Sequence, residues 1–330
     1  MPNAKISGIS SYVPDDVLDN EMLSKMVDTN DEWITSRVGI KERRILKDEN
    51  LGSSYMGIQA VNRLLAETET APADVELLIC ATSNPDYRFP STASVIAEGC
   101  GMGNAYAYDI QAACAGFLVT MQAARAYIES GLYKKIVVVC AEKMSSMTDY
   151  QDRATCPLFG DAAAAVLVEP TDEPVGVVDG EFHVDGSGLS HLLMKAGGSA
   201  RKASHETVEA REHYIYQEGR VVYKNAVRDM LSSSLSVMKR NNLSVEDIDW
   251  FVPHQANLRI IEAVGSRIKI PEEKTLVNIQ HYGNTSAASI PLCLDEFKGR
   301  LKKGDKIVMT AFGAGFTWGA MYLIWAIDPK

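Results

Sequence analysis

Helical and strand-like patterns alternate along this chain from one end to the other. Apolar residues at helical spacing predict helices over Leu51–Glu67, Cys114–Ser130 and Val221–Lys239. Near-continuous apolar runs predict buried strands at Ile136–Ala141 and Ala163–Glu169. Such alternation predicts an α/β fold. The other expected elements are strands at 5–13, 75–81, 176–185, 247–252, 275–279, 306–311 and 317–327, and helices at 258–268 and 286–300.

A polar, proline-bearing segment, Glu169–Pro174, interrupts this pattern and is the best candidate for a joint between domains. On each side of it strands and helices alternate, and each side ends in adjacent strands. The order of elements therefore predicts two similar halves, residues 1–172 and 173–330, although no residue-level repeat relates them. Residues 189–217 are charged and lack clear periodicity, so a surface excursion is expected there.

Composition and charge exclude several classes of protein. The 330 residues are 46% hydrophobic and 23% charged, which is ordinary for a globular chain, and the formal net charge is −10. An acidic chain is not expected to bind nucleic acid or an anionic membrane. No apolar run approaches the ~18 residues of a membrane helix. Six scattered cysteines without CxxC pairs, and histidines without metal-ligand spacing, predict a cytoplasmic protein with reduced thiols and no metal.

Cys114 is the candidate nucleophile because small residues crowd it on both sides, from Ala112 to Gly116. That crowding permits a tight turn from a loop into a helix, with the thiol exposed at the helix start. There the unpaired backbone N–H groups and the helix dipole would favour the thiolate. The alternative is a small cysteine buried in the core.

Two candidate partners of this thiol come late in the chain. His254 follows an expected strand, and Asn284 lies at an expected junction between a strand and a helix. Catalytic groups of α/β folds gather at the carboxyl ends of strands, and both side chains can donate to a developing oxyanion. The alternatives are a core histidine satisfied by backbone groups and an asparagine that caps a turn or helix. His281 lies close enough to Asn284 to remain a competing candidate.

A glycine-rich segment and a basic cluster are the remaining candidates. The segment Ala311–Gly319 precedes a strand rather than a helix, so phosphate-binding glycine motifs do not fit it. It could supply a backbone N–H to an oxyanion, or simply form a tight hairpin. Trp33 precedes the basic residues Arg37, Lys41 and Arg43, a combination that suits a nucleotide phosphate or, alternatively, a solvated basic face.

Four motifs in order make the sequence specific: Ala112–Phe117, Val252–Asn257, Gly283–Ser289 and Phe312–Gly319. The chain resembles the β-ketoacyl-[acyl-carrier-protein] synthase III family, the initiating condensing enzymes of bacterial fatty acid synthesis, over nearly its whole length. The resemblance implies a thiolase-like fold: two similar α/β halves stacked as a five-layered αβαβα sandwich, usually in a homodimer.

The resemblance also implies a Cys–His–Asn triad at Cys114, His254 and Asn284. In that mechanism the Cys114 thiolate takes a short acyl group from acyl-CoA, and malonyl-acyl carrier protein then loses CO2 and attacks the acyl-cysteine. His254 and Asn284 would stabilise the enolate oxygen, and the backbone N–H groups of Cys114 and Ala314 would form the oxyanion hole. No cofactor is implied, since CoA enters as part of the substrate.

Further binding residues follow from the same resemblance. Trp33 and Arg153 match positions that sandwich the adenine of CoA, Arg37 matches a phosphate contact, and Asn257 matches a contact to the pantetheine arm. Two basic residues, Lys224 and Arg259, are candidates for receiving the acidic carrier protein. Phe89 matches a residue that crosses a dimer interface to close the partner's acyl pocket.

The sequence departs from the family pattern at two places and leaves two alternatives open. Ala314 replaces a glycine and Asp161–Ala165 replaces a more glycine-rich stretch, which narrows the backbone dihedrals near the oxyanion hole without removing its donors. The first alternative is an acyl-cysteine synthase of secondary metabolism with another acceptor. The second is a non-catalytic partner subunit, against which the intact triad argues. The primer's length and branching are not fixed by the sequence.

Overall fold

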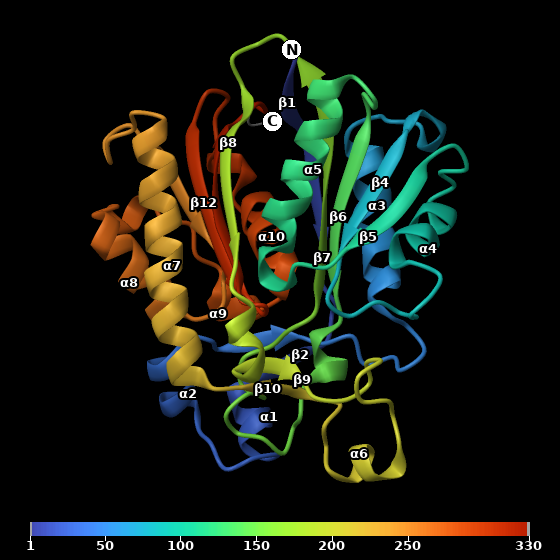
Figure 1. Cartoon of the computed structure of the whole chain (residues 1–330), viewed down its shortest axis with the longest axis vertical. Coiled ribbons are helices and arrows are strands. Elements are labelled where there is room, and N and C mark those ends of the chain that lie inside the picture. The colour runs from blue at the N-terminus through green and yellow to red at the C-terminus, as the bar shows by residue number, and fades with distance from the viewer. Residues whose placement is uncertain (1, 329–330) are drawn as a thin grey trace.

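The computed structural model describes residues 2–328, which form two sheets with helices between and around them (Figure 1). The first sheet belongs to the N-terminal half and has the strand order β1-β7-β6-β4-β5. The neighbouring strands β6, β4 and β5 run parallel to one another, whereas β1 and β7 pair antiparallel. The bounds are β1 Asn3–Tyr12, β4 Leu77–Ala81, β5 Tyr106–Ile110, β6 Ile136–Glu142 and β7 Ala162–Thr171.

The second sheet belongs to the C-terminal half and has the order β11-β12-β13-β8. β11 pairs parallel with β12, and β12, β13 and β8 pair antiparallel. The chain passes from the first sheet to the second between β7 and β8, within the proline-bearing segment expected to be a joint. The bounds are β8 Gly176–Val184, β11 Trp250–Pro253, β12 Lys306–Gly313 and β13 Thr317–Ile324.

Two helices, α5 (Gly116–Ser130) and α10 (Ser289–Glu296), lie between the sheets (Figure 1). The apolar stripe predicted for α5 is fully buried, because both of its sides pack on strands. Outer layers are formed by α3 (Ser53–Glu67) and α4 (Thr92–Gly99) on the first sheet, and by α7 (Gly219–Arg240) and α8 (Leu258–Ile268) on the second. The predicted five-layered α/β sandwich is therefore confirmed.

Short elements gather at one end of the sandwich, where α5 and α10 begin (Figure 1). The surface excursion expected at 189–217 is found, but it contains a two-stranded sheet and a short helix. The bounds are β2 Val17–Asp19, α1 Asn20–Ser24, α2 Asp31–Val38, β3 Glu42–Arg44, β9 Leu192–Met194, α6 His205–Glu209, β10 Ile215–Gln217 and α9 Ile279–Tyr282.

One predicted strand, 275–279, is wrong. Thr275 makes only an isolated bridge to Phe251, and the chain then turns into the short helix α9. This apolar segment is too short for its period to distinguish a strand from a helical turn. Within residues 2–328, no helix combines the length and apolar character needed to cross a membrane.

Candidate active site

Cys114 lies on a single 3₁₀ turn, Ala113–Ala115, between β5 and α5. The α-helix begins at Gly116, two residues later than predicted, and Ala113 has a left-handed φ of 46°. Gly313, at the end of β12, packs directly on this turn, since a Cβ there would lie 2.6 Å from the Cys114 nitrogen. The turn therefore touches a strand of the other half, which places the cysteine at the junction of the two sheets.

The Cys114 thiol is half-buried and donates to Ser286 Oγ at 3.7 Å. Burial raises the pKa of this thiol to about 12, and the nearby Glu142 carboxylate adds to the rise, against a lowering by Ser286. The predicted stabilisation of a thiolate at an exposed helix start is therefore wrong for this state. Desolvation outweighs the hydrogen bonds from Ser286 and from the Cys114 backbone N–H that favour the thiolate, so Cys114 carries its proton at neutral pH.

Asn284 is oriented by its own loop. Its Oδ1 accepts the Ser286 N–H at 2.8 Å, which leaves the Nδ2 group as a donor. Backbone hydrogen bonds hold the residue to the N-terminal half, from Asn284 N–H to Leu158 O at 2.8 Å and from Gly160 N–H to Asn284 O at 3.1 Å. The amide donor is thus fixed at the junction beside the Cys114 turn.

His254 is buried at the carboxyl end of β11, where its N–H donates to Thr310 O at 2.8 Å. Its Nδ1 lies 2.6 Å from Ser289 Oγ, and this oxygen also accepts the Gln255 N–H at 3.3 Å. Burial lowers the pKa of His254 to about 3, so the ring is neutral. In the tautomer that carries the ring proton on Nε2, the Ser289 hydroxyl donates to Nδ1 and Nε2 remains a donor; we assign this tautomer to His254.

The glycine-rich segment forms a tight hairpin, as one of the two alternatives predicted. β12 and β13 pair antiparallel up to Gly313 and Thr317, and Ala314 is the first residue of the three-residue turn between them. Alanine retains the backbone N–H, so the turn can still donate to an oxyanion. The hairpin is adjacent to Cys114 through Gly313.

The residues matched to CoA binding form a group around Trp33 on α2. The Arg153 guanidinium lies 5.2 Å and the Arg37 guanidinium 5.9 Å from the centre of the Trp33 ring. Arg153 also pairs with Asp28 at 3.0 Å. A planar ligand between the Trp33 ring and the Arg153 guanidinium needs these two groups to be roughly 7 Å apart, because it makes a contact of about 3.5 Å with each. Arg153, which is exposed, must therefore swing outward to admit one.

The start of α8 lies beside this group, because Gly39, which ends α2 with a φ of 78°, packs against Leu258. Asn257 caps α8 by accepting the Arg259 N–H at 2.9 Å. The exposed Arg259 guanidinium lies 5.5 Å from the Tyr223 ring of α7, next to the exposed Lys224. Arg259 of α8 therefore contacts the part of α7 that carries Lys224.

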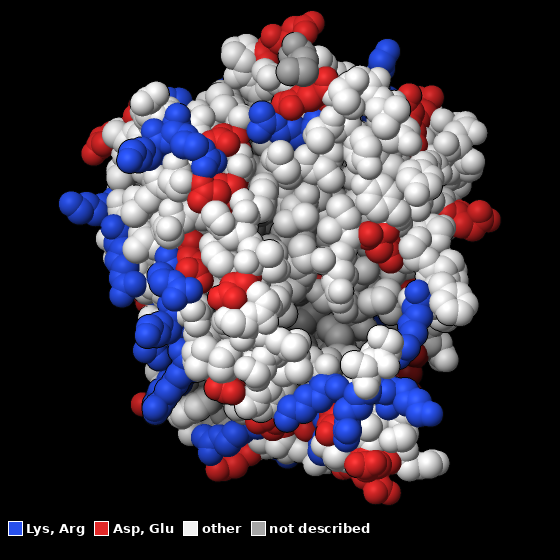
Figure 2. Space-filling view, viewed as in Figure 1, with Lys and Arg blue, Asp and Glu red and all other residues white. Residues whose placement is uncertain are grey.

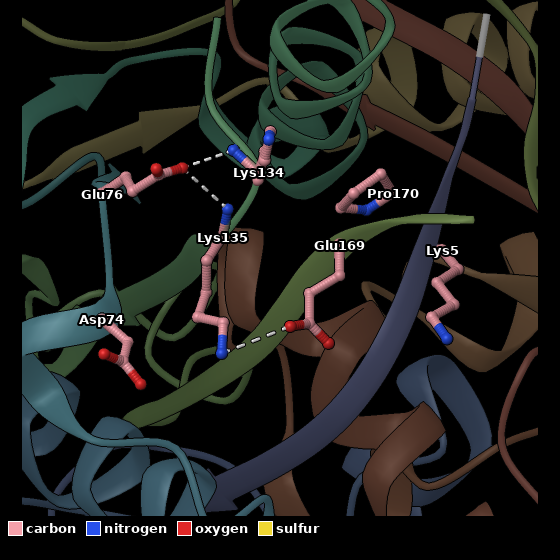
Figure 3. Close-up of a pocket in the computed structure, with 7 residues that line it drawn as sticks. All are labelled: Lys5, Asp74, Glu76, Lys134, Lys135, Glu169 and Pro170. Atoms are coloured by element: carbon pink, nitrogen blue, oxygen red, sulfur yellow. Dashed lines mark hydrogen bonds and ion pairs between the residues drawn. The ribbon is translucent and has the colours of Figure 1, made fainter. Parts of the chain in front are cut away.

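Two features lie apart from this site. Phe89, on the loop after β4, is 85% exposed and makes no aromatic contact recorded within residues 2–328. A shallow pocket at the amino ends of β4 and β6 (Figure 3) is lined by acidic and basic residues, some of which bind one another. There Glu76 accepts the Lys135 N–H at 3.1 Å, and the Lys135 ammonium lies 3.5 Å from Glu169. The pocket is at the opposite end of these strands from Cys114.

Three buried residues of the site were not singled out from the sequence. Ser286 contacts the Cys114 thiol, Ser289 contacts His254, and Glu142 influences the pKa of Cys114. Both serines lie inside the motif Gly283–Ser289, which the sequence did identify. Their location near the site could therefore be predicted, but their contacts with Cys114 and His254 could not. Glu142 is a charged residue that ends an otherwise apolar strand, and this contrast is the signal that could have found it.

Comparison with known proteins identifies the family. Residues 108–186 match the family described as 3-oxoacyl-[acyl-carrier-protein (ACP)] synthase III, and residues 238–325 match its C-terminal part. A Bacteroides thetaiotaomicron protein named β-ketoacyl-[acyl-carrier-protein] synthase III 2 is 56% identical over 99% of this chain and 98% of its own length. The chain belongs to the 3-oxoacyl-[acyl-carrier-protein] synthase III family. The predicted resemblance is confirmed.

Solved structures of synthase III proteins share the fold. The 3-oxoacyl-[acyl-carrier-protein] synthase III of Aquifex aeolicus is 43% identical with a TM-score of 0.89, covering 98% of this chain and all of that one. A priming β-ketosynthase from the R1128 polyketide pathway is 32% identical with a TM-score of 0.91, covering all of this chain and 98% of that one. The thiolase-like α/β class predicted from the motifs is confirmed by these synthase III structures.

Proposed function

We propose that this synthase III condenses a short acyl-CoA with malonyl-acyl carrier protein, releasing CoA and CO2 and giving a 3-oxoacyl-acyl carrier protein that initiates fatty acid synthesis. The observation that carries the proposal is that one short segment, Asn284–Ser289, contacts both Cys114 and His254. The Cys114 thiol donates to Ser286 Oγ at 3.7 Å, the Ser286 N–H donates to Asn284 Oδ1 at 2.8 Å, and His254 Nδ1 lies 2.6 Å from Ser289 Oγ. A nucleophile and two neutral hydrogen-bond donors are what acyl transfer followed by decarboxylation requires.

The first half of the reaction uses Cys114. Its sulfur attacks the thioester carbonyl of acyl-CoA, and the backbone N–H groups of Cys114 and Ala314 stabilise the tetrahedral oxyanion. CoA leaves as its thiol, and the acyl group stays on Cys114. His254 does not take the proton in this step, because its low pKa makes the imidazole a poor base.

The second half uses His254 and Asn284. Malonyl-acyl carrier protein loses CO2, and the electron pair left behind is delocalised onto the thioester oxygen as an enolate. Donation from Nε2 of His254 and Nδ2 of Asn284 stabilises that oxygen. The enolate carbon then attacks the acyl-cysteine and releases the Cys114 thiolate, which is protonated to regenerate the enzyme.

CoA is bound, in this proposal, by Trp33, Arg37, Arg153 and Asn257. The indole face stacks on the adenine once Arg153 moves to the far side of the ring, and the Arg37 guanidinium binds phosphate. Asn257 Nδ2 remains available for the pantetheine arm because only its Oδ1 caps α8.

Replacing Arg37 and Arg153 together by alanine is expected to raise KM for acyl-CoA about 10-fold or more and to change kcat little. Each guanidinium binds the substrate equally in its ground and transition states, and loss of uniform binding appears in KM. Arg63→Ala is the matched control. Arg63 also stacks on an aromatic ring, that of Tyr12, but Arg63 itself lies on the outer helix α3. An unchanged KM in the double variant would remove both arginines from the CoA site.

The acidic carrier protein is proposed to dock on the basic edge formed by α7 and α8. Lys and Arg side chains gather along this edge of the molecule (Figure 2), and Lys224 and Arg259 are both exposed on it. Long-range attraction between an acidic partner and such an edge increases the rate of association.

A homodimer is proposed because the N-terminal sheet ends in an open strand. β5 is the edge of that sheet, and the exposed aromatic residues Tyr87, Phe89 and Tyr106 lie on it or on the neighbouring loop. An apolar edge strand favours pairing with a second chain. Sedimentation is expected to give twice the 36.1 kDa of one chain, and Phe89→Asp is expected to shift the population toward monomer. A monomer in the unmodified protein would contradict the proposed pairing.

Mass spectrometry of the Cys114 peptide tests the proposed function. Incubation with acetyl-CoA is expected to add one acetyl group to Cys114 and release one CoA. No acyl group on Cys114 would contradict the proposed activity and would favour the non-catalytic alternative. A chain that is acylated but uses an acceptor other than malonyl-acyl carrier protein would favour the secondary-metabolism alternative.

A further inference from the structure

Gln255, the residue after His254, has a buried side-chain amide with no role in the mechanism described so far. Its Nε2 donates to Pro253 O at 2.7 Å and to Leu276 O at 3.3 Å, and its Oε1 accepts the Asn278 N–H at 3.0 Å. Both protons of the amide and its oxygen are therefore bound by backbone groups. Such complete pairing fixes a buried side chain in one orientation.

The backbone groups that Gln255 binds belong to the end of β11 and to the segment that leads to Asn284. From Asn278 this segment passes directly into the short helix α9. There the Ile279 O accepts the Gly283 N–H at 2.9 Å, and Gly283 is the residue before Asn284. The amide of Gln255 therefore fixes the start of the turn that presents Asn284.

Gln255 also binds the chain on the other side of Asn284. Its backbone N–H donates to Ser289 Oγ at 3.3 Å, and the same oxygen lies 2.6 Å from Nδ1 of His254. Gln255 therefore holds the segment that carries Asn284 at both ends, by its side chain at Asn278 and by its backbone at Ser289.

We propose that Gln255 is a positioning residue that sets the spacing between the two donors to the enolate, Nε2 of His254 and Nδ2 of Asn284. This inference rests on the proposed function and deepens its decarboxylation half. One donor belongs to the residue before Gln255, and the other lies on the segment that Gln255 holds at both ends. Gln255 acts through these two residues and not on the substrate, because both of its amide protons are already bound.

The spacing matters because two donors stabilise one oxygen only when both lie within hydrogen-bond distance of it at the same time. The His254 N–H donates to Thr310 O at 2.8 Å, whereas the backbone of Asn284 is bound to the loop before β7 in the N-terminal half. These bonds tie each residue to a different part of the molecule. The bonds of Gln255 connect the two parts directly, so they determine how far apart the donors lie.

Gln255→Met tests the proposal, because methionine is also long and unbranched but offers neither amide protons nor a carbonyl oxygen. The kcat for decarboxylation of malonyl-acyl carrier protein is expected to fall about 10- to 100-fold, the cost of displacing a group at the reacting centre. Its KM is expected to change little, because the enolate forms only after the substrate has bound. Acylation of Cys114 by acetyl-CoA, which uses neither donor, should be nearly unchanged.

Asn241→Leu is the matched control. The Asn241 amide also donates twice, to Asp179 at 2.7 Å and to Val237 O at 2.8 Å, but it lies just after the end of α7. This variant loses two hydrogen bonds as well, and both rates should remain unchanged. Equal falls in decarboxylation in Asn241→Leu and Gln255→Met would show a general loss of structure and overturn the proposal.

A double-mutant cycle separates positioning from a structural defect elsewhere. Asn284→Ala alone is expected to lower decarboxylation about 100-fold, the cost of one oxyanion donor. The same substitution in a Gln255→Met chain is expected to cost much less, because the displaced amide no longer reaches the oxygen. The two losses should therefore be far from additive, as they are for residues that act together.

The outcomes distinguish the positioning role from the proposed function beneath it. Unchanged decarboxylation in Gln255→Met, a rise in KM alone, or additive losses in the cycle overturn the positioning role and leave the proposed function in place. Absence of decarboxylation in the unmodified chain overturns the proposed function, and the positioning role with it. If Gln255→Met does not fold, Gln255→Glu decides the question alone, since it keeps the oxygen that binds Asn278 and removes the amide nitrogen opposite two carbonyl oxygens.

Discussion

Replacing Cys114 by alanine is expected to abolish acyl transfer from acyl-CoA, by at least about 1,000-fold, while malonyl-acyl carrier protein is still decarboxylated. Acyl transfer requires a covalent bond to the sulfur, and no neighbouring group can replace it. Decarboxylation requires only the donors of His254 and Asn284, and neither depends on the thiol for its orientation. Ser289 orients the imidazole, and the Ser286 N–H orients the amide.

Two assays on the same preparation measure this separation. Release of CoA from acetyl-CoA reports acyl transfer, and release of labelled CO2 from malonyl-acyl carrier protein reports decarboxylation. Cys100→Ala is the control, because Cys100 is another buried cysteine but ends the outer helix α4. Acyl transfer that survives Cys114→Ala would exclude this residue as the nucleophile, and simultaneous loss of both activities would contradict the division between thiol and donors.

Replacing His254 by alanine is expected to lower the decarboxylation rate about 100- to 1,000-fold, the cost of removing one oxyanion donor. Acylation of Cys114 is expected to fall much less, because the imidazole is neither its base nor a donor to its oxyanion hole. The pKa of about 3 keeps His254 neutral from mildly acidic to alkaline pH. Its donor capacity should therefore not change across that range.

The same pair of assays tests this prediction. His183→Ala is the control, since His183 is an exposed histidine that stacks on Trp318 on the same sheet. Loss of acylation and decarboxylation to the same extent in His254→Ala would show that His254 serves both halves of the reaction. It would contradict the assignment of its role to the enolate alone.

Much of the fold could be predicted from the sequence because its main elements have strong periods. The stripe of α5 faces strands on both sides, and β6 is buried along its whole length, so their patterns are unambiguous. Two elements of the N-terminal half, β5 and α4, could not be predicted in the same way. The edge strand β5 is half-exposed, and α4 consists largely of small residues, so neither has a clear apolar period.

The candidate site was predictable in its residue types and not in its electrostatics. Motif order pointed to Cys114, His254 and Asn284, whereas the contact between Cys114 and Ser286 joins residues 172 positions apart. The thiol pKa depends on how deeply that contact buries the sulfur and on the distance to Glu142. Reasoning from the helix dipole predicted a lowered thiol pKa, which is the wrong direction. The local sequence shows neither the burial of the sulfur nor its distance from Glu142.

Condensation itself is the most direct test of this account. The purified chain would be incubated with acetyl-CoA and malonyl-acyl carrier protein labelled at the free carboxyl group, and the carrier protein would be weighed afterwards. We predict one labelled CO2 and one CoA released for each 3-oxobutanoyl-acyl carrier protein formed, with a panel of longer and branched acyl-CoA primers defining the preferred chain. Release of CoA and CO2 without a 3-oxoacyl product on the carrier protein would contradict the account.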